Sequence, residues 1–104
     1  MIGKKDLRYE KTVLVGVVNS LESNQKSIEY LDELKFLTQT AGGLVLKVFI
    51  QKIKQTNPKT FIGSGKLNEI KFFVYKNDIT TVIFDDELSP VQLRNIEEKL
   101  KCKI

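Results

Sequence analysis

The run TVLVGVV at residues 12–18 decides the fold class of this chain. It is an almost unbroken series of β-branched apolar residues, without alternation between apolar and polar positions. Such a run is typical of a strand buried on both faces, as in parallel sheets that carry helices on each side. The remaining chain should therefore alternate between helices and further strands.

That alternation is found along the sequence that follows. Apolar residues recur at helical spacing up to Gly42-Gly43, a usual end of a helix, and then a β-branched apolar run returns. The predicted segments, in order, are a helix at residues 27–41, a strand at 44–53, a helix at 66–76 and a strand at 79–84.

A third helix has the clearest start signal. Ser89 offers an N-cap hydroxyl, Pro90 suits the first helical position, and Gln92 completes a capping box. This helix is expected to run to Leu100, and residues 102–104 to open a fourth strand. The sequence thus predicts an α/β fold in β-α-β-α-β-α-β order, with a small, mostly parallel β-sheet and helices packed on its faces. Because strands are usually longer than three residues, we expect the chain to be a fragment of a longer protein.

Composition limits the class of protein. A chain of 104 residues forms one domain, and 41% hydrophobic with 29% charged residues is typical of a globular protein. No apolar run approaches the roughly 20 residues that span a bilayer. The charged residues Lys4, Lys5, Asp6 and Arg8 are not followed by the apolar h-region of a signal peptide, so we expect no secretory signal. The single Cys102 fits a reducing cytoplasm, and the absence of histidine excludes imidazole-based hydrolase dyads and the usual zinc sites.

Positive charge is concentrated in the middle of the chain. Residues 34–68 contain no Asp or Glu but six lysines, which are Lys35, Lys47, Lys52, Lys54, Lys59 and Lys66. Taking these six from the 17 basic residues leaves 11 against 13 acidic residues elsewhere. Such a segment can attract a phosphate backbone, or it can simply solvate an exposed edge of the sheet.

The stretch FIGSGKLNEI, residues 61–70, resembles a nucleotide-binding loop only in part. A P-loop has the form G-x-x-x-x-G-K-[ST], which here would require a glycine at Thr60 and a hydroxyl at Leu67. Both positions fail, so we do not interpret this stretch as a P-loop.

Two loops should open on the same side of the sheet, because parallel strands end at one edge. One is the loop after Ile53 that contains these glycines, which we call the glycine loop, and the other is the acidic turn at residues 85–87. We expect the glycine loop to be the most mobile region.

The acidic turn has two interpretations. Asp85, Asp86 and Glu87 follow a strand end, where such a cluster can hold magnesium. They also precede the start of a helix, where the macrodipole favours negative charge. The second interpretation is favoured because Ser89 and Pro90 mark that helix start directly afterwards.

Three motifs together resemble a known family. They are Thr40-Ala41-Gly42, then TFIGSGK at residues 60–66, then FDDELSP at residues 84–90 with Gln92, Arg94 and Asn95 following. The combination closely resembles the amino-terminal domain of the HflX family of GTPases, which has an A-G, a Y-I-G-[ST]-G-K loop and an F-D-[DN]-E-L-[ST]-P-x-Q-x-R-N turn in this order. The match covers the chain from about residue 21 onward, and Phe61 stands where an aromatic is usual.

The resemblance implies that residues 1–104 are the amino-terminal domain of a cytoplasmic, ribosome-associated GTPase. In the family a helical hairpin and a GTP-binding domain follow, and both are absent from these residues. No G-x-x-x-x-G-K-[ST], D-x-x-G or N-K-x-D sequence occurs. GTP and magnesium are therefore expected in the parent protein, and this domain by itself is not expected to hydrolyse GTP.

The leading hypothesis is a module that binds large-subunit ribosomal RNA and regulates the G domain. The phosphate-binding residues would be Lys52, Lys54, Lys59, Gly63, Ser64, Gly65 and Lys66. The lysines supply positive charge, and the free amides at the start of the helix accept an anion. A separate role, docking on the G domain, would be played by Asp85, Asp86, Glu87 and Arg94. The alternative function is a second nucleotide-binding or magnesium-dependent phosphoryl-transfer site, built from the glycine loop and the acidic turn.

Overall fold

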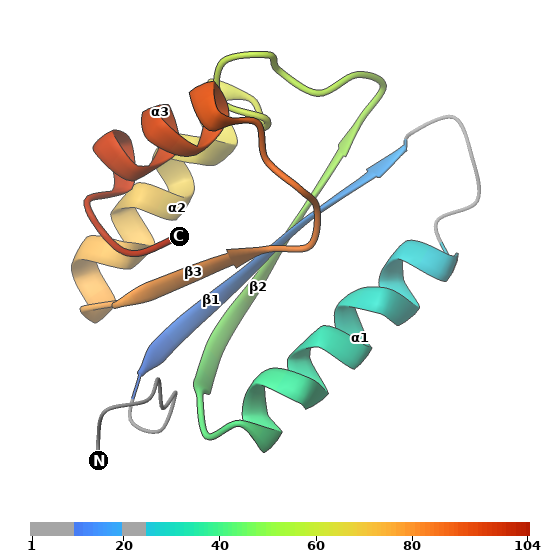
Figure 1. Cartoon of the computed structure of the whole chain (residues 1–104), viewed down its shortest axis with the longest axis vertical. Coiled ribbons are helices and arrows are strands. Elements are labelled where there is room, and N and C mark those ends of the chain that lie inside the picture. The colour runs from blue at the N-terminus through green and yellow to red at the C-terminus, as the bar shows by residue number, and fades with distance from the viewer. Residues whose placement is uncertain (1–9, 20–24) are drawn as a thin grey trace.

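The computed structural model describes residues 10–19 and 25–104, which form a parallel β-sheet and the helices that cover it (Figure 1). The elements in order are β1 (Lys11–Asn19), α1 (Gln25–Thr40), β2 (Leu44–Ile53), α2 (Ser64–Asn77), β3 (Thr81–Phe84) and α3 (Pro90–Leu100). The predicted α/β class and the parallel strands are confirmed. The charged residues 4–8, and residues 20–24 between β1 and α1, lie outside the described residues.

The run TVLVGVV forms the central strand. The sheet order is β2-β1-β3, and β1 pairs in parallel with both neighbours. Val13, Leu14 and Val15 are almost completely buried, because helices cover both faces of this strand. The prediction of a strand buried on both sides is therefore confirmed.

The predicted fourth strand is wrong for the described residues. Lys103 pairs with Thr81 in a single parallel bridge. Its amide donates to the carbonyl oxygen of Thr80 (3.2 Å), and its carbonyl oxygen accepts from the amide of Val82 (2.8 Å). One paired residue is too short to be a strand, so the sheet has three strands among the described residues.

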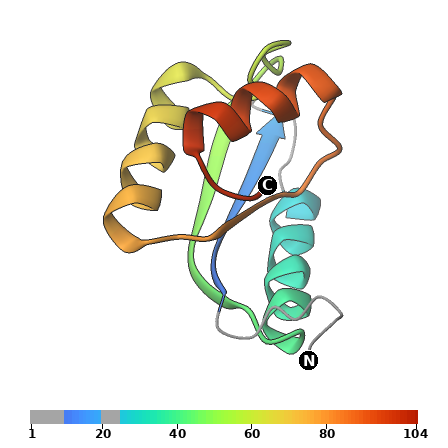
Figure 2. The same ribbon diagram turned by 60° about the vertical axis from the view of Figure 1, so that its left-hand side comes forward.

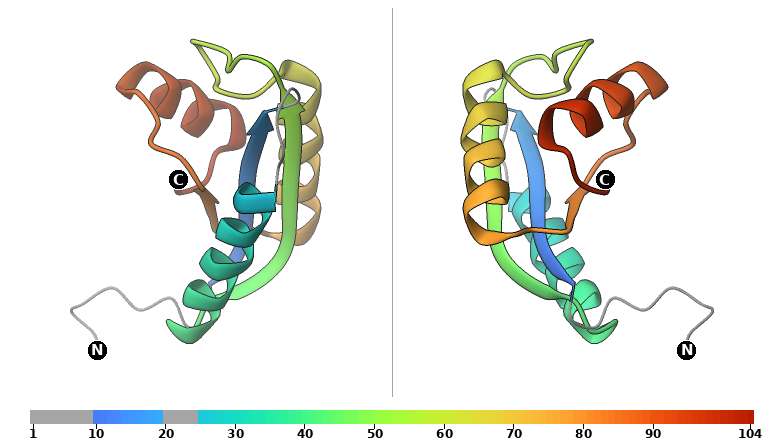
Figure 3. Two further views of the ribbon diagram at one scale, coloured as in Figure 1. Left: turned by 90° about the vertical axis from the view of Figure 1, so that its right-hand side faces the viewer. Right: turned by 90° about the vertical axis from the view of Figure 1, so that its left-hand side faces the viewer.

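The helices lie on opposite faces of the sheet. The two opposite views of Figure 3 show α1 in front of the strands in one and behind them in the other, while α2 and α3 share the remaining face. Val13 and Val15 pack with α2 and α3, whereas Gly16 faces α1. A Cβ built on Gly16 would lie 2.5 Å from Cδ1 of Leu31, so the glycine is what allows α1 to pack this closely.

The two faces are buried to different extents. The main core lies between the sheet and the α2 and α3 helices, with Phe49, Ile70, Val82 and Ile96 among its buried residues. On the other face, α1 buries only Leu31 and Thr38 among its described residues. Its predicted apolar stripe is thus only partly buried, and Ile28 and Leu37 remain exposed.

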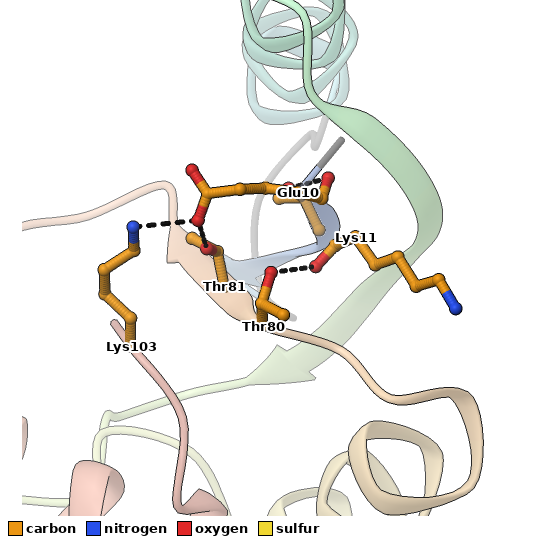
Figure 4. A network of polar contacts seen from close by, with 6 residues as sticks. Glu10, Lys11, Thr80, Thr81 and Lys103 are labelled. Atoms are coloured by element: carbon orange, nitrogen blue, oxygen red, sulfur yellow. Dashed lines mark hydrogen bonds and ion pairs between the residues drawn. The ribbon is translucent and has the colours of Figure 1, made fainter. Parts of the chain in front are cut away.

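A polar network ties the start of β1 to the end of the chain (Figure 4). One carboxylate oxygen of Glu10 accepts from the hydroxyl of Thr81 (2.7 Å) and from the ammonium of Lys103 (2.8 Å). The hydroxyl of Thr80 donates to the carbonyl oxygen of Lys11 (3.3 Å). These contacts hold β3 between β1 and the Lys103 segment.

Candidate functional site

Both motif loops open at the carboxyl edge of the sheet, as predicted. The glycine loop, residues 54–63, follows β2, and the acidic turn, residues 85–87, follows β3 (Figures 1 and 2). All three strands run in parallel, so their carboxyl ends share this edge. Open α/β sheets usually bind their ligands there.

The glycine loop closes on itself around Asn57. The amide of Asn57 donates to the carbonyl oxygen of Phe61 (3.0 Å), and the amide of Phe61 donates back (2.7 Å). The side-chain oxygen of Asn57 accepts from the amides of Lys59 (2.7 Å) and Thr60 (3.2 Å). An asparagine side chain that bonds the following backbone in this way defines a turn, so the tip of the loop has a specified path.

Helix α3 and strand β2 hold the loop from outside. The Nε2 of Gln92 donates to the carbonyl oxygen of Asn57, and the Nδ2 of Asn95 donates to that of Lys59, both at 2.9 Å. The side-chain oxygen of Gln51 accepts from the amide of Gly63 (3.0 Å). The glycines favour mobility when the sequence is read alone, but these bonds from β2 and α3 anchor the loop.

Gln92 takes part in two structures at once. Its amide donates to Oγ of Ser89 (3.1 Å), and its Oε1 accepts from the amide of Ser89 (2.9 Å), so the predicted capping box is confirmed. The remaining Nε2 of the same side chain is the donor to Asn57. Gln92 is buried, and it couples the start of α3 to the tip of the glycine loop.

An aromatic pair connects the glycine loop with the end of β3. The rings of Phe61 and Phe84 meet edge to face with centroids 6.0 Å apart, an arrangement that aromatic pairs favour. Phe61 belongs to the glycine loop, and Phe84 directly precedes the acidic turn. Phe61 has a φ of 69°, so its backbone is in the left-handed conformation, and its side chain is buried.

The predicted phosphate-binding lysines are not gathered on one face. Lys66 pairs with Glu69 (3.2 Å), and its ammonium lies 6.0 Å from the ring centroid of Phe49, on the α2 side of β2. Lys52 is three residues from Phe49 along the same strand, so it points to the opposite face. Lys54 and Lys59 are exposed in or beside the loop itself.

The start of α2 has fewer free amides than the sequence implied. The amide of Gly63 is already bonded to Gln51, which removes Gly63 from the predicted phosphate-binding amides. The first turn of α2 receives no side-chain cap, so Ser64, Gly65 and Lys66 carry the remaining amides of this helix start. A Cβ built on Gly65 would meet no atom within 4 Å, so the space in front of it is open.

The acidic turn lies beside a small crevice. The amide of Asp85 donates to the carbonyl oxygen of Val15 (2.9 Å) and so extends the ladder of β3. Burial, and then the charge of Asp86, raises the pKa of Asp85; burial also raises the pKa of Asp86. A crevice of about 310 Å³ lies at this edge and includes Ser27, Lys54 and Asp86 in its lining.

The described part of the chain contains neither a cluster of metal-ligating side chains nor a helix suited to a membrane. Across residues 10–19 and 25–104, no three His, Cys, Asp or Glu side chains gather as they would around a metal ion. None of the helices described has the length and apolarity needed to cross a lipid bilayer.

The residues that shape the site were only partly predictable. Gln92 and Asn95 stand in the motif that follows the acidic turn, but no pattern in the sequence indicates that they bind the glycine loop. Gln51 carries no sequence signal at all, because its bond to Gly63 spans 12 residues. Asn57 precedes a proline, which marks a turn without showing its internal bonds.

Comparisons with known proteins show sequences similar to this chain. A family model described as GTP-binding GTPase N-terminal matches residues 28–104. A GTPase HflX of Flavobacterium psychrophilum is 52% identical over 104 residues, covering 100% of this chain and 25% of the relative. GTPase HflX proteins of Lacrimispora saccharolytica and Escherichia coli are 41% and 34% identical over 95 and 97 residues, covering 91% and 93% of this chain and 22% and 23% of each relative. The chain thus spans about a quarter of the length of these relatives.

Proposed function

Because the chain belongs to the HflX family, as its amino-terminal domain, we propose that it is the ribosomal-RNA-binding and regulatory module of a GTP-binding protein. The parent protein is a cytoplasmic GTPase of the large ribosomal subunit, and GTP and magnesium bind in a separate G domain that follows a helical hairpin. These 104 residues bind RNA and do not themselves catalyse hydrolysis.

The observation that carries this proposal is the anchored glycine loop. Gln92, Asn95 and Gln51 bond its backbone at Asn57, Lys59 and Gly63, respectively, and the exposed side chains of Lys54 and Lys59 extend from this anchored loop. A pre-ordered loop loses little conformational entropy on binding, and lysines at its surface release counterions from a phosphate backbone.

The uncapped start of α2 adds a neutral phosphate contact. The amides of Ser64, Gly65 and Lys66 point out of the helix end, where the macrodipole favours an anion. Lys66 contributes its amide more than its ammonium, because the ammonium is paired with Glu69. Lys52 lies on the other face of β2 and serves RNA that wraps around the edge strand.

The acidic turn has a different partner in this proposal. Asp85, Asp86, Glu87 and Arg94 form no salt bridge with any side chain of residues 10–19 and 25–104. They are proposed to contact the G domain of the same protein, so that RNA bound at the glycine loop is sensed through Gln92 and α3.

A salt titration of RNA affinity tests the loop. Replacing Lys54 and Lys59 together with glutamine should lower the slope of log affinity against log salt by about 1.4 to 1.8, since each lost phosphate contact accounts for about 0.7 to 0.9. The matched control replaces Lys26 and Lys35, two exposed lysines of α1, with glutamine. An equal slope for both double variants would overturn the loop proposal.

Gly65→Ala separates RNA binding from stability. The new methyl meets no protein atom, and alanine is the better helix former by about 1 kcal/mol, so the folded state should not be weakened. The Cβ of a helical residue points toward the helix start, so the methyl crowds a phosphate bound there. The expected result is weaker RNA binding at unchanged or higher stability, measured on the same preparation.

A second candidate function is nucleotide binding at the crevice beside Lys54 and Asp86. The observation in its favour is that a cation and a carboxylate line one hollow at the ligand edge of the sheet. Equilibrium dialysis of the chain against ATP and GTP with magnesium tests it directly. Absence of binding at millimolar nucleotide would remove this candidate.

A further inference from the structure

A second basic surface lies away from the glycine loop, at the end of the sheet where α2 and α3 finish (Figure 1). It is formed by residues of the last two turns of α2, by Lys99 near the end of α3 and by the residue after α3. We call it the α2–α3 surface, and it consists of Lys71, Phe72, Tyr75, Lys76, Lys99 and Lys101. No function proposed above uses any of these residues.

Two aromatic rings stand out from this surface. Tyr75 is 85% exposed and Phe72 is 65% exposed, and they are three residues apart on α2, so they share one side of the helix. The ammonium of Lys76 lies 5.6 Å from the ring centroid of Phe72. Neighbouring exposed aromatics of this kind commonly mark a binding surface.

A pocket of about 280 Å³ lies beside Tyr75. Its floor is apolar, made by the buried side chains of Val74, Ile79 and Leu100. The charged residues around it are Lys71, Lys99, Lys101 and a single acid, Asp78. The pocket therefore combines an apolar base with a predominantly positive rim.

The lysines of this surface have no acidic partner in the described structure. Within residues 10–19 and 25–104, Lys71, Lys76, Lys99 and Lys101 form no salt bridge. Helix α2 carries one acid, Glu69, and that side chain is paired with Lys66 at the far end of the helix. Four cations are thus available to an anionic ligand.

We infer that the α2–α3 surface binds single-stranded RNA. An unstacked base stacks on Tyr75 or Phe72, and the flanking phosphates contact the lysines around the pocket. An acidic peptide would satisfy the lysines but would leave the exposed rings without a flat partner, so the aromatic pair favours a nucleic-acid strand. The inference adds a second surface, for bases as well as phosphates, to the phosphate contacts proposed at the glycine loop.

The absence of tryptophan from the chain allows a direct test of stacking. Tyr75→Trp introduces a single tryptophan on the surface, and Tyr30→Trp introduces one at another exposed tyrosine position, on α1, that is 62% exposed. The probe is a single-stranded oligouridylate of about ten nucleotides, within the usual footprint of such sites. Oligouridylate should quench the emission of Tyr75→Trp and leave that of Tyr30→Trp unchanged.

Affinity measurements on a double variant test the energetic role of the rings. Phe72→Ala with Tyr75→Ala should weaken oligouridylate binding by about tenfold or more, because stacking on an aromatic side chain contributes substantially for each base. The control, Tyr30→Ala with Phe36→Ala, removes one tyrosine and one phenylalanine ring that are also exposed, at 62% and 66%, but lie on α1. Far-ultraviolet circular dichroism verifies that both double variants are folded.

Several results would overturn the inference. Equal affinity of the Phe72/Tyr75 variant and the wild type would exclude stacking, and equal binding of polyglutamate and oligouridylate would show that charge alone is recognised. Failure of the glycine-loop proposal is distinguishable: Lys54→Gln with Lys59→Gln would then leave RNA affinity unchanged, while the quenching of Tyr75→Trp persists.

Discussion

The bond from Gln92 to the glycine loop can be removed without removing the capping box. In Gln92→Glu, one carboxylate oxygen still accepts from the amide of Ser89, as Oε1 does now at 2.9 Å. The other oxygen replaces Nε2 and faces the carbonyl oxygen of Asn57, where the donor now lies at 2.9 Å. A hydrogen bond thereby becomes a contact between two acceptors, one of them charged.

The expected cost at neutral pH is about 2 to 4 kcal/mol. The lost hydrogen bond accounts for about 1 kcal/mol, and a buried oxygen left without a donor adds about 1 to 3 kcal/mol. Gln92 is only 9% exposed, so water offers little compensation. Since a domain of this size is stable by about 5 to 15 kcal/mol, the change should be large but should leave the domain folded.

The cost should depend on pH. The carboxyl of the variant gains a proton more readily in the folded state, since the protonated form can donate to Asn57, so its folded pKa lies above its unfolded pKa. Stability relative to the wild type is therefore regained as pH falls through the raised pKa, and lost as pH rises through it. Urea unfolding at about pH 7 and about pH 5, followed by circular dichroism, measures this difference.

Gln39→Glu is the matched control, because it makes the same change at an exposed position of α1 and should cost less than about 0.5 kcal/mol. Hydrogen exchange gives a local reading, since the amides of Lys59 and Thr60 are held by Asn57 and should exchange faster in Gln92→Glu. If Gln92→Glu were as stable as Gln39→Glu, with unchanged exchange at these amides, α3 would not anchor the loop.

Three further changes test the fold. Gly16→Ala places a methyl 2.5 Å from Leu31 and should cost about 1 to 3 kcal/mol in thermal unfolding; wild-type stability would mean that α1 does not pack closely on β1. Glu10→Gln removes the ion pair with Lys103 and should cost about 0.5 to 1 kcal/mol in urea unfolding, with a smaller loss at high salt; a loss that does not respond to salt would argue against an ionic contribution. Burial raises the pKa of Asp86, so the folded state binds the proton of this carboxyl more tightly than the unfolded state does. The contribution of Asp86 to the free energy of unfolding therefore falls as pH rises above the ordinary aspartate value of 3.8 and through the raised pKa. Asp86→Asn should therefore be at least as stable as the wild type at neutral pH, with a flatter dependence of stability on pH, and a clear loss of stability there would contradict the assignment.

Features that depend on neighbouring residues were predictable from the sequence. The capping box of Ser89 and Gln92 lies within four residues, and the TVLVGVV run shows its burial in its own composition. The shared edge of the two loops followed from the predicted parallel direction of the strands. These predictions needed no knowledge of which segments meet in space.

Features that depend on distant residues were not predictable. The second bond of Gln92 spans 35 residues, and nothing local marks it. The separation of Lys52 from Lys66 depends on which face of β2 is covered by α2, and no local pattern marks that choice. The lysines from Lys35 to Lys66 share one acid-free segment of the sequence, but the pleat of β2 turns Lys52 to the face opposite Phe49, beside which Lys66 lies.

The hydrogen bonds from α3 to the glycine loop end on main-chain carbonyl oxygens, those of Asn57 and Lys59. Every residue type carries such an oxygen, so the hydrogen bond to position 59 does not depend on the side chain at that position. The loop can thus exchange lysine for an acidic, aromatic or small residue and still follow the same path. The backbone path of the loop is therefore independent of the side chain at position 59. A substitution there can change what the domain recognises without changing the path of the loop.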